Sequence, residues 1–309
     1  MKETFKNRLD IYRKNPWRIA RGLARRGWLV FLSDKAYLQI MYRANLGKRL
    51  NWKNPKTYNE KLQWLKLYDR RPIYNKMVDK YEAKQYIAER VGAQYVPLVV
   101  GGPWRSFDEI NFDRLQERFV LKTTHDCGGV WICKDKNKLD VDKARAFLNR
   151  HMEDNYYRRH REWPYKNIQP RIFAEEYLEG MADGDLRDYK FFTFHGVPKM
   201  MFVASERQDP TTETKFDFFD MDYRHLPIVQ GHPNSDKQIA KPIHFEKMKE
   251  IAGILSQGIP QLRIDFFESN GRLYVGELTF SHYAGFVPFE PEEWDEKIGT
   301  WLVLPKMEK

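Results

Sequence analysis

The spacing of hydrophobic residues divides the chain into a helical first part and a second part rich in strands. Apolar side chains recur every three or four residues in the segments 51–71 and 75–91, which predicts amphipathic helices. Later segments alternate apolar and polar positions, and the predicted strands are 96–100, 119–124, 130–134, 172–178, 188–194, 198–205, 217–220, 263–267 and 273–279. Further helices are predicted at 140–160, 245–255 and 292–301. Helices followed by antiparallel hairpins that helices interrupt are typical of the α+β class.

The most informative segment is the last predicted hairpin, in which a turn at 269–271 joins two largely apolar strands. Each strand has one carboxylate, Asp265 or Glu277, at an alternating position, so the two can lie side by side on one sheet face. Because neighbouring carboxylates repel unless a cation joins them, the pair suits Mg²⁺. Arg263 and Thr279 fall on the same face, which gives the groups that a phosphate-handling metal site needs. A surface hairpin with solvated charges is the alternative.

A second candidate site follows the predicted strand that carries Lys122. A lysine in an apolar strand is costly to bury unless it meets an anion. The loop after it contains Thr124, Gly128 and Gly129, and glycines let backbone N–H groups approach phosphate oxygens closely. The spacing matches neither a Walker A loop nor a dinucleotide fingerprint. A plain hairpin turn remains the alternative.

Two further strand ends carry candidate ligand-binding residues. The strand 172–178 ends in Glu175-Glu176-Tyr177-Leu178. Its exposed backbone edge can imitate a base pair for adenine, and an acid there can accept a hydrogen bond from the exocyclic amine of adenine. A solvated strand end is the alternative. Asp188 and Lys190 share one strand face, and Arg207 ends the partner strand. These charges suit a phosphate or carboxylate ligand, or else surface ion pairs.

Composition narrows the partners and the chemistry. The chain has 53 Lys and Arg against 43 Asp and Glu, a net charge of +10, which favours an anionic partner such as a nucleotide, nucleic acid, phospholipid or acidic glycan. Two cysteines exclude a disulfide framework and fit a reducing compartment. The first residues have no apolar signal core, so a cytoplasmic protein is expected. No HExxH pair and no GxSxG elbow is present, which argues against zinc and serine hydrolases.

The first 50 residues are basic and helical in pattern. They combine several arginines with Trp17, Trp28 and Phe31. A basic helix with such apolar residues can lie on an anionic membrane surface. The alternative is an ordinary helix whose apolar face packs on the body of the protein.

The order of these features resembles the ATP-grasp superfamily, and the run from about 50 to 305 resembles its TupA-like branch of teichuronopeptide and polysaccharide biosynthesis. Lys80 lies at a helix start, Lys122 precedes a glycine-bearing loop, and the acidic strand end and the R-x-D and E-x-T strands follow. The matching strings are YNEKLQWLKLYDRRPIYNKMVDKY, FVLKTTHDCGGVWICKDKNKLD, REWPYKNIQPRIFAEEYL, LRDYKFFTFHG and RIDFFESNGRLYVGELTF.

The resemblance implies an ATP-grasp fold, in which two α+β subdomains grip ATP, with a basic helical N-terminal extension. The expected division is a basic helical region over 1–70 and an ATP-grasp domain over 71–305. Within that domain, about 115–205 would form the central ATP-binding subdomain and 206–305 the C-terminal catalytic subdomain.

The resemblance also assigns roles to individual residues. The catalytic residues would be Arg263, Lys122 and Arg207. The nucleotide-binding residues would be Lys80, Lys122, Thr124, Gly128, Gly129, Glu175, Glu176, Tyr177, Leu178, Asp188 and Lys190. The metal ligands for Mg²⁺, or alternatively Mn²⁺, would be Asp265, Glu277 and Thr279. Many ATP-grasp enzymes have Asn where this chain has Thr279, so direct coordination by that residue is an open question.

The chemistry that the resemblance implies is an ADP-forming carboxylate–amine ligation through an acyl phosphate. The expected carboxylate belongs to a hexuronic acid in a capsular or cell-surface polysaccharide, or in its lipid-linked or nucleotide-linked precursor. The amine would be an amino acid or another small amine. The expected place is the cytoplasm, with peripheral contact at the inner face of the membrane. Alternatives are an ATP-grasp kinase, a glycosyltransferase and a salt-sensitive nucleic-acid binder.

Overall fold

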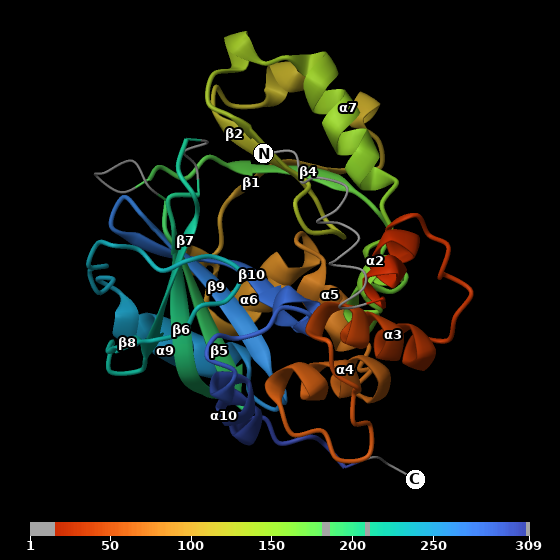
Figure 1. Ribbon diagram of the computed structural model, residues 1–309. Coiled ribbons are helices and arrows are strands. Elements are labelled where there is room, and N and C mark those ends of the chain that lie inside the picture. The colour runs from red at the N-terminus through yellow and green to blue at the C-terminus, as the bar shows by residue number, and fades with distance from the viewer. Residues whose placement is uncertain (1–15, 181–185, 208–210, 307–309) are drawn as a thin grey trace.

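The computed structural model describes residues 16–180, 186–207 and 211–306, and it has the α+β architecture that the hydrophobic pattern predicts. Its strands form two antiparallel sheets, one of four strands in the order β1-β4-β2-β3 and one of six in the order β10-β9-β5-β6-β7-β8. Figure 1 shows the smaller sheet at the top beside helix α7, the larger sheet below it, and the N-terminal helices to one side. The basic region expected over 1–70 is described from residue 16 on.

The first part of the chain is helical, as expected. Its helices are α2 (Arg18–Arg25), α3 (Asp34–Leu46), α4 (Tyr58–Tyr68), α5 (Ile73–Val78) and α6 (Glu82–Val91). The single helix predicted over 75–91 is wrong, because Asp79 separates α5 from α6. Its Oδ1 accepts the backbone N–H groups of Tyr81 at 2.9 Å and Glu82 at 3.0 Å, which starts a new helix there. In the described part of the chain, no helix is long and apolar enough to cross a membrane.

The smaller sheet forms the upper lobe together with one long helix. Its strands are β1 (Val99–Trp104), β2 (Phe119–Thr123), β3 (Val130–Cys133) and β4 (Ile172–Glu176). Helix α7 (Val141–Met152) buries Ala144 and Leu148 against Phe119 and Leu121 of β2. The helix predicted over 140–160 is wrong in its second half, since α8 (Tyr156–His160) is a separate helix that the side chain of Asn155 caps.

The larger sheet is covered on both faces. Its strands are β5 (Asp188–Phe194), β6 (Val197–Ser205), β7 (Lys215–Asp220), β8 (His225–Leu226), β9 (Leu262–Ser269) and β10 (Arg272–Thr279). Helix α9 (Phe245–Leu255) packs with α5 and α6 on one face, where Phe191 and Met201 lie in the core. Helices α4 and α10 (Glu293–Trp301) cover the other face, where Phe192 and Phe202 lie.

The boundary between the sheets differs from the division expected at 205/206. Strands β5 and β6 pair with β9 and β7 in the larger sheet, so the change of sheet falls between β4 and β5. The reason is that β5 is buried along its whole length, which requires a neighbour on each side and a helix layer on each face.

Helices α4 and α10 make a close contact that holds the lower lobe together. The Asn59 backbone N–H and side-chain amide donate to the two oxygens of Asp295 at 2.8 and 3.1 Å. Gly299 of α10 lies directly on the chain that leads into α4, and a Cβ there would be 2.2 Å from the Lys56 carbonyl oxygen. This contact therefore requires glycine for its lack of a side chain, although its backbone is ordinary helix.

Two helical glycines should respond to alanine in opposite directions. Gly299→Ala should lower the free energy of unfolding by about 1–3 kcal/mol, because overpacking against backbone outweighs the gain in helix propensity. Gly22→Ala in α2, where a Cβ would meet nothing within 4 Å, should leave stability unchanged or raise it by up to about 1 kcal/mol. Denaturant unfolding of both variants measures the difference. A stabilising Gly299→Ala would contradict the close packing.

Candidate active site

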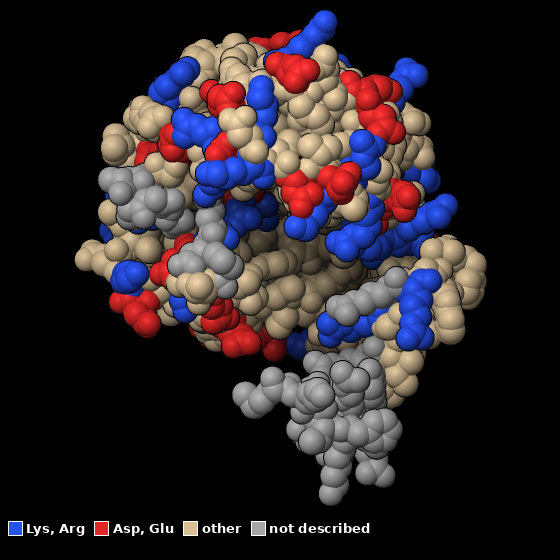
Figure 2. Space-filling view, turned by 90° about the horizontal axis from the view of Figure 1, so that it is seen from above, with Lys and Arg blue, Asp and Glu red and all other residues tan. Residues whose placement is uncertain are grey.

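A cavity of about 420 Å³ lies between the two sheets. It is lined by strands β2, β3 and β4 from one sheet and by β5, β9 and β10 from the other. Seen from above, the molecule has a hollow whose surroundings carry Lys and Arg as well as Asp and Glu side chains (Figure 2). Twelve of the expected site residues line the cavity: Lys80, Lys122, Gly128, Glu175, Glu176, Tyr177, Leu178, Asp188, Lys190, Arg207, Asp265 and Glu277. Thr124, Gly129, Arg263 and Thr279 are not in its lining.

A β-bulge at Gly276 sets the charged floor of the cavity. The ladder between β9 and β10 is regular as far as Val275, which pairs with Phe266, and after Gly276 it resumes with Glu277 opposite Asp265. Residues directly opposite in an antiparallel pair share a face, so a regular ladder would have placed Gly276 opposite Asp265 and turned Glu277 to the other face. The bulge therefore brings the two carboxylates together.

Asp265 is buried and already holds two cations of the protein. Its oxygens accept from Arg263 Nε at 2.7 Å and Nη2 at 2.8 Å, and Oδ2 also accepts from Lys190 of the neighbouring strand β5. Burial alone would raise the pKa of this carboxyl, but Arg263 and Lys190 outweigh it and hold the pKa well below its usual range. The carboxylate is therefore ionised and fixed in one position.

Arg263 lies behind the cavity and is fixed by four hydrogen bonds to three side chains. Besides Asp265, it donates to the Thr279 hydroxyl at 3.0 Å and to His282 Nδ1 at 2.7 Å. Burial, and next the Arg263 guanidinium, lower the pKa of His282 well below its usual value, so a neutral imidazole accepts from Arg263 and donates to Gln230 at 3.0 Å. In this arrangement Thr279 positions Arg263, and its role as a metal ligand stays a prediction.

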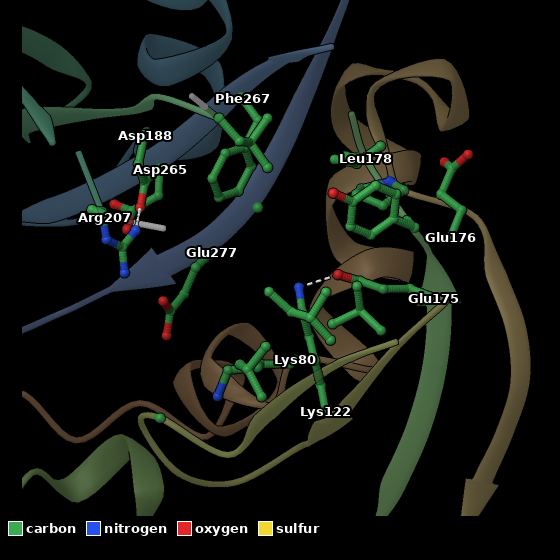
Figure 3. Close-up of a pocket in the computed structure, with 18 of the residues that line it drawn as sticks. Lys80, Lys122, Glu175, Glu176, Leu178, Asp188, Arg207, Asp265, Phe267 and Glu277 are labelled. Atoms are coloured by element: carbon green, nitrogen blue, oxygen red, sulfur yellow. Dashed lines mark hydrogen bonds and ion pairs between the residues drawn. The ribbon is translucent and has the colours of Figure 1, made fainter. Parts of the chain in front are cut away.

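Glu277 is the carboxylate with room for a metal ion. Its side chain points into the cavity (Figure 3), and among the described residues it has neither a hydrogen bond nor an ion pair. Among the described residues, no group of three or more His, Cys, Asp or Glu side chains is placed so that it could hold a metal ion. Mg²⁺ commonly binds one or two carboxylates together with phosphate oxygens and water. Glu277 with Asp265 beside it fits that donor set.

The opposite wall of the cavity presents two lysines. Lys80 Nζ donates to the Asp126 carbonyl, and Lys122 pairs with Glu175 Oε1. Glu175 Oε2 pairs at 2.9 Å with Lys84, which is absent from the cavity lining. Burial would raise the pKa of Glu175, but the two lysines outweigh it and lower the pKa to about 2. Glu175 therefore holds Lys122 in place.

The strand end after Glu175 offers backbone groups instead. Glu176 Oε1 accepts from the Leu98 backbone N–H at 2.8 Å, so part of its carboxylate is also engaged. Tyr177 and Leu178 follow β4 without belonging to a strand, and both line the cavity. With both Glu175 oxygens in ion pairs, this backbone is the better placed group for contacting a purine edge.

The loop after β2 is held by bonds within itself and to neighbouring segments. The Thr124 carbonyl accepts from the Lys80 backbone N–H at 2.9 Å, and the Gly129 carbonyl accepts from the Thr123 N–H at 2.8 Å. Asp126, which sequence reasoning did not single out, accepts from the Thr123 hydroxyl and pairs with His151. Thr124 and Gly129 thus shape the loop, while Gly128 reaches the cavity.

Sequence reasoning missed the apolar walls and one buried acid. Val120, Val130, Ile132 and Phe267 also line the cavity, and their only signal was alternation within predicted strands. Leu186 lines it too, but lies outside every predicted strand. A Cβ at Gly276 would lie 2.2 Å from the Phe267 ring, so the bulge glycine also makes room for that wall.

The missed acid is Glu162, which lies in the string REWPYKN and is 1 % exposed. Burial raises the pKa of Glu162 to about 7, and Ser281 donates a hydrogen bond to its carboxylate. Its Oε1 has no hydrogen-bond partner among the described residues. No motif pointed to it.

The chain was compared with solved structures, curated sequences and family profiles. A D-alanine–D-alanine ligase from Bacillus anthracis in complex with ATP aligns with a TM-score of 0.40 and 15% identity, over 66% of this chain and 55% of that one. The ATP-grasp ligase PsnB in complex with a precursor variant, Mg and ADP aligns with a TM-score of 0.40 and 10% identity, over 74% and 60%.

An N5-carboxyaminoimidazole synthase from Aspergillus clavatus, in complex with ADP and 5-aminoimidazole ribonucleotide, aligns with a TM-score of 0.38 and 10% identity, over 67% of this chain and 46% of that one. The chain thus spans less than two thirds of the length of each of these three structures. No curated protein sequence matches it. The profile of the TupA-like ATP-grasp family matches residues 60–303, which covers most of the chain and every residue of the cavity. The protein therefore belongs to the TupA-like ATP-grasp family.

Proposed function

We propose that the protein is an ATP- and Mg²⁺-dependent ligase that joins a carboxylate to an amine. The observation that carries the proposal is the cross-strand pair of Asp265 and Glu277, which faces Lys80 and Lys122 across one cavity. Two carboxylates opposite two lysines suit a metal-bound polyphosphate, and family membership gives that ligand as ATP.

The chain's own residues supply position and charge. Lys80 and Lys122 would bind phosphate oxygens, and the backbone at Tyr177 and Leu178 would contact the adenine between apolar side chains. Asp265 and Glu277 would hold Mg²⁺, which neutralises phosphate charge when bound. In the first step a substrate carboxylate oxygen bonds to the γ-phosphorus as the bond to the β-phosphate oxygen breaks, and ADP leaves.

In the second step the amine nitrogen bonds to the acyl carbon, phosphate leaves with the former carboxylate oxygen, and the amine loses a proton. Arg263, whose charge is permanent and whose position is fixed by Asp265 and His282, would stabilise the charge that develops on the acyl phosphate. No protein nucleophile is needed for either step.

The finer proposal concerns the substrates. A hexuronic acid in a cell-surface polysaccharide or its precursor is the proposed carboxylate, and an amino acid or small amine is the proposed partner. The support is the TupA-like family match together with the net charge of +10, which suits an acidic glycan.

An isotope experiment tests the reaction class. The protein is incubated with ATP, Mg²⁺ and a panel of uronic acids and amines, with oxygen-18 in the uronic carboxylate. A ligase releases ADP only when both substrates are present, transfers one labelled oxygen to phosphate, and forms an amide that mass spectrometry detects. A phosphate ester that keeps both labelled oxygens in the uronic carboxylate, with no amide formed, would instead identify a kinase. A product that forms only from a nucleotide sugar would identify a glycosyltransferase.

Removing the unpaired carboxylate should abolish ATP turnover. Glu277→Gln should lower the rate of ADP release by roughly a hundredfold or more, because it removes the charge that faces the metal. Asp265→Asn should do the same but also lower stability, since it leaves Arg263 and Lys190 without their shared anion. Glu296→Gln, an exposed acid of α10, is the charge-matched control and should retain full turnover. Full turnover by Glu277→Gln would rule out the proposed metal site.

Substituting each of the two lysines that pair with Glu175 should distinguish an effect on ATP binding from an effect on stability. Lys122→Met and Lys84→Met should both lower the free energy of unfolding, because each leaves Glu175 with one counterion. Only Lys122 lines the cavity, so Lys122→Met alone should raise the KM for ATP by roughly tenfold or more. Steady-state kinetics and denaturant unfolding measure the two effects. Equal rises in KM for both variants would show that Lys122 acts only through the fold.

A further inference from the structure

The turn between α2 and α3 exposes an unusual amount of apolar surface. Trp28 is 61 % exposed, Val30 45 % and Phe31 78 %, all within four residues of sequence. Just before this turn, Trp17 and Ile19 are also exposed, by 39 % and 53 %. Large aromatic side chains are costly to leave in water, and a contiguous exposed group of them marks an interaction surface.

The inner side of the same turn is fixed to the body of the protein. Leu29 and Leu32 turn inward onto the core that α3 forms with residues after β10. The buried guanidinium of Arg161 donates to the backbone carbonyl of Val30 at 3.1 Å and approaches that of Leu29 at 3.5 Å. The turn is therefore a defined structure whose apolar side chains alternate between the core and the solvent.

Charge distinguishes this surface from an ordinary protein contact. Residues 16–33 contain four arginines and no acidic residue. Arg26 is exposed and lies 5.8 Å from the centre of the Trp28 ring, and Lys35 is exposed just after the turn. Arg43 lies 4.8 Å from the centre of the Trp17 ring. The first acid after the turn, Asp34, pairs with Arg70 at 2.9 Å. Arginine beside exposed tryptophan is the combination that enters the headgroup layer of an anionic bilayer.

We infer that the turn at residues 28–31 is a membrane-docking site, in which Trp28, Val30 and Phe31 insert between the headgroups of an anionic bilayer while Arg26 and Lys35 contact lipid phosphates. The proposed partner is the lipid surface itself. The support is the excess of positive charge around the turn and the outward exposure of its apolar side chains. This docking is independent of the proposed reaction. The sequence predicted that a basic helix would lie along the membrane surface. The inference differs in that the turn between two helices inserts its side chains into the membrane.

Vesicle flotation of the full chain tests the inference. The wild type should float at low salt with vesicles of phosphatidylcholine and phosphatidylglycerol, and much less with phosphatidylcholine alone. The double variant Trp28→Ser/Phe31→Ser should lower the partition constant by about tenfold or more. The matched control is Ile243→Ser, which removes an 83 % exposed apolar side chain elsewhere and should bind as the wild type does. Arg26→Gln/Lys35→Gln should weaken binding and reduce its salt dependence.

The outcomes separate this inference from the proposed reaction. No flotation of the wild type with phosphatidylglycerol vesicles, or equal flotation of Trp28→Ser/Phe31→Ser and Ile243→Ser, would overturn the docking site. Equal binding to neutral vesicles would overturn the choice of an anionic surface. The assay needs neither ATP nor substrate, and the double variant should keep its ADP-release rate with soluble substrates. If the ligase assay fails, the membrane-docking inference is unaffected. If the flotation assay fails, the proposed ligase reaction is unaffected.

Discussion

The single extra residue in the last hairpin decides what the cavity can bind. Without the bulge at Gly276, Glu277 would face the layer of α9 and the hydrophobic core instead of Asp265. An ionised carboxylate there would be very costly, so the bulge both creates the paired acids and avoids a buried charge. Glycine is required because a side chain at 276 would occupy the space of the Phe267 ring. Charge, pocket shape and strand register thus depend on one residue.

Most charges around the cavity are held by other charges of the protein. Asp265 is held by Arg263 and Lys190, and Lys122 is held by Glu175, which Lys84 also neutralises. Such networks fix the positions of side chains that would otherwise be mobile, at little net gain in stability. Glu277 differs because it forms no ion pair with a described residue, although the charge of Arg263 acts on it electrostatically. A site built in this way presents one unpaired carboxylate to a cation in a preorganised setting.

Much of this arrangement follows from patterns in the sequence. Alternation predicted most strands of the two sheets, but it missed β8 and placed β1 too early in the chain. Charged residues within apolar strands identified most of the cavity lining. Local capping divided two of the predicted helices, because Asp79 and Asn155 interrupt segments whose apolar spacing continues. The sheet to which β5 belongs could not be predicted, since its partner β9 lies about seventy residues away. The bulge at Gly276 could not be predicted from alternation either. The expected pairing of Asp265 and Glu277 is right only because this bulge shifts the register of β10.

Two consecutive residues connect the membrane-docking turn to the segment that follows β10, the strand that carries Glu277. Arg161 holds the backbone of residues 29 and 30, while Glu162 is hydrogen-bonded to Ser281, which follows β10 closely. Both side chains are almost fully buried, so no flexible linker separates the two regions. A bilayer bound at the turn would therefore set the height and tilt of the cleft above the lipid. The enzyme would then favour acceptors presented at one distance from the surface, as a lipid-linked sugar is, over chains free in solution.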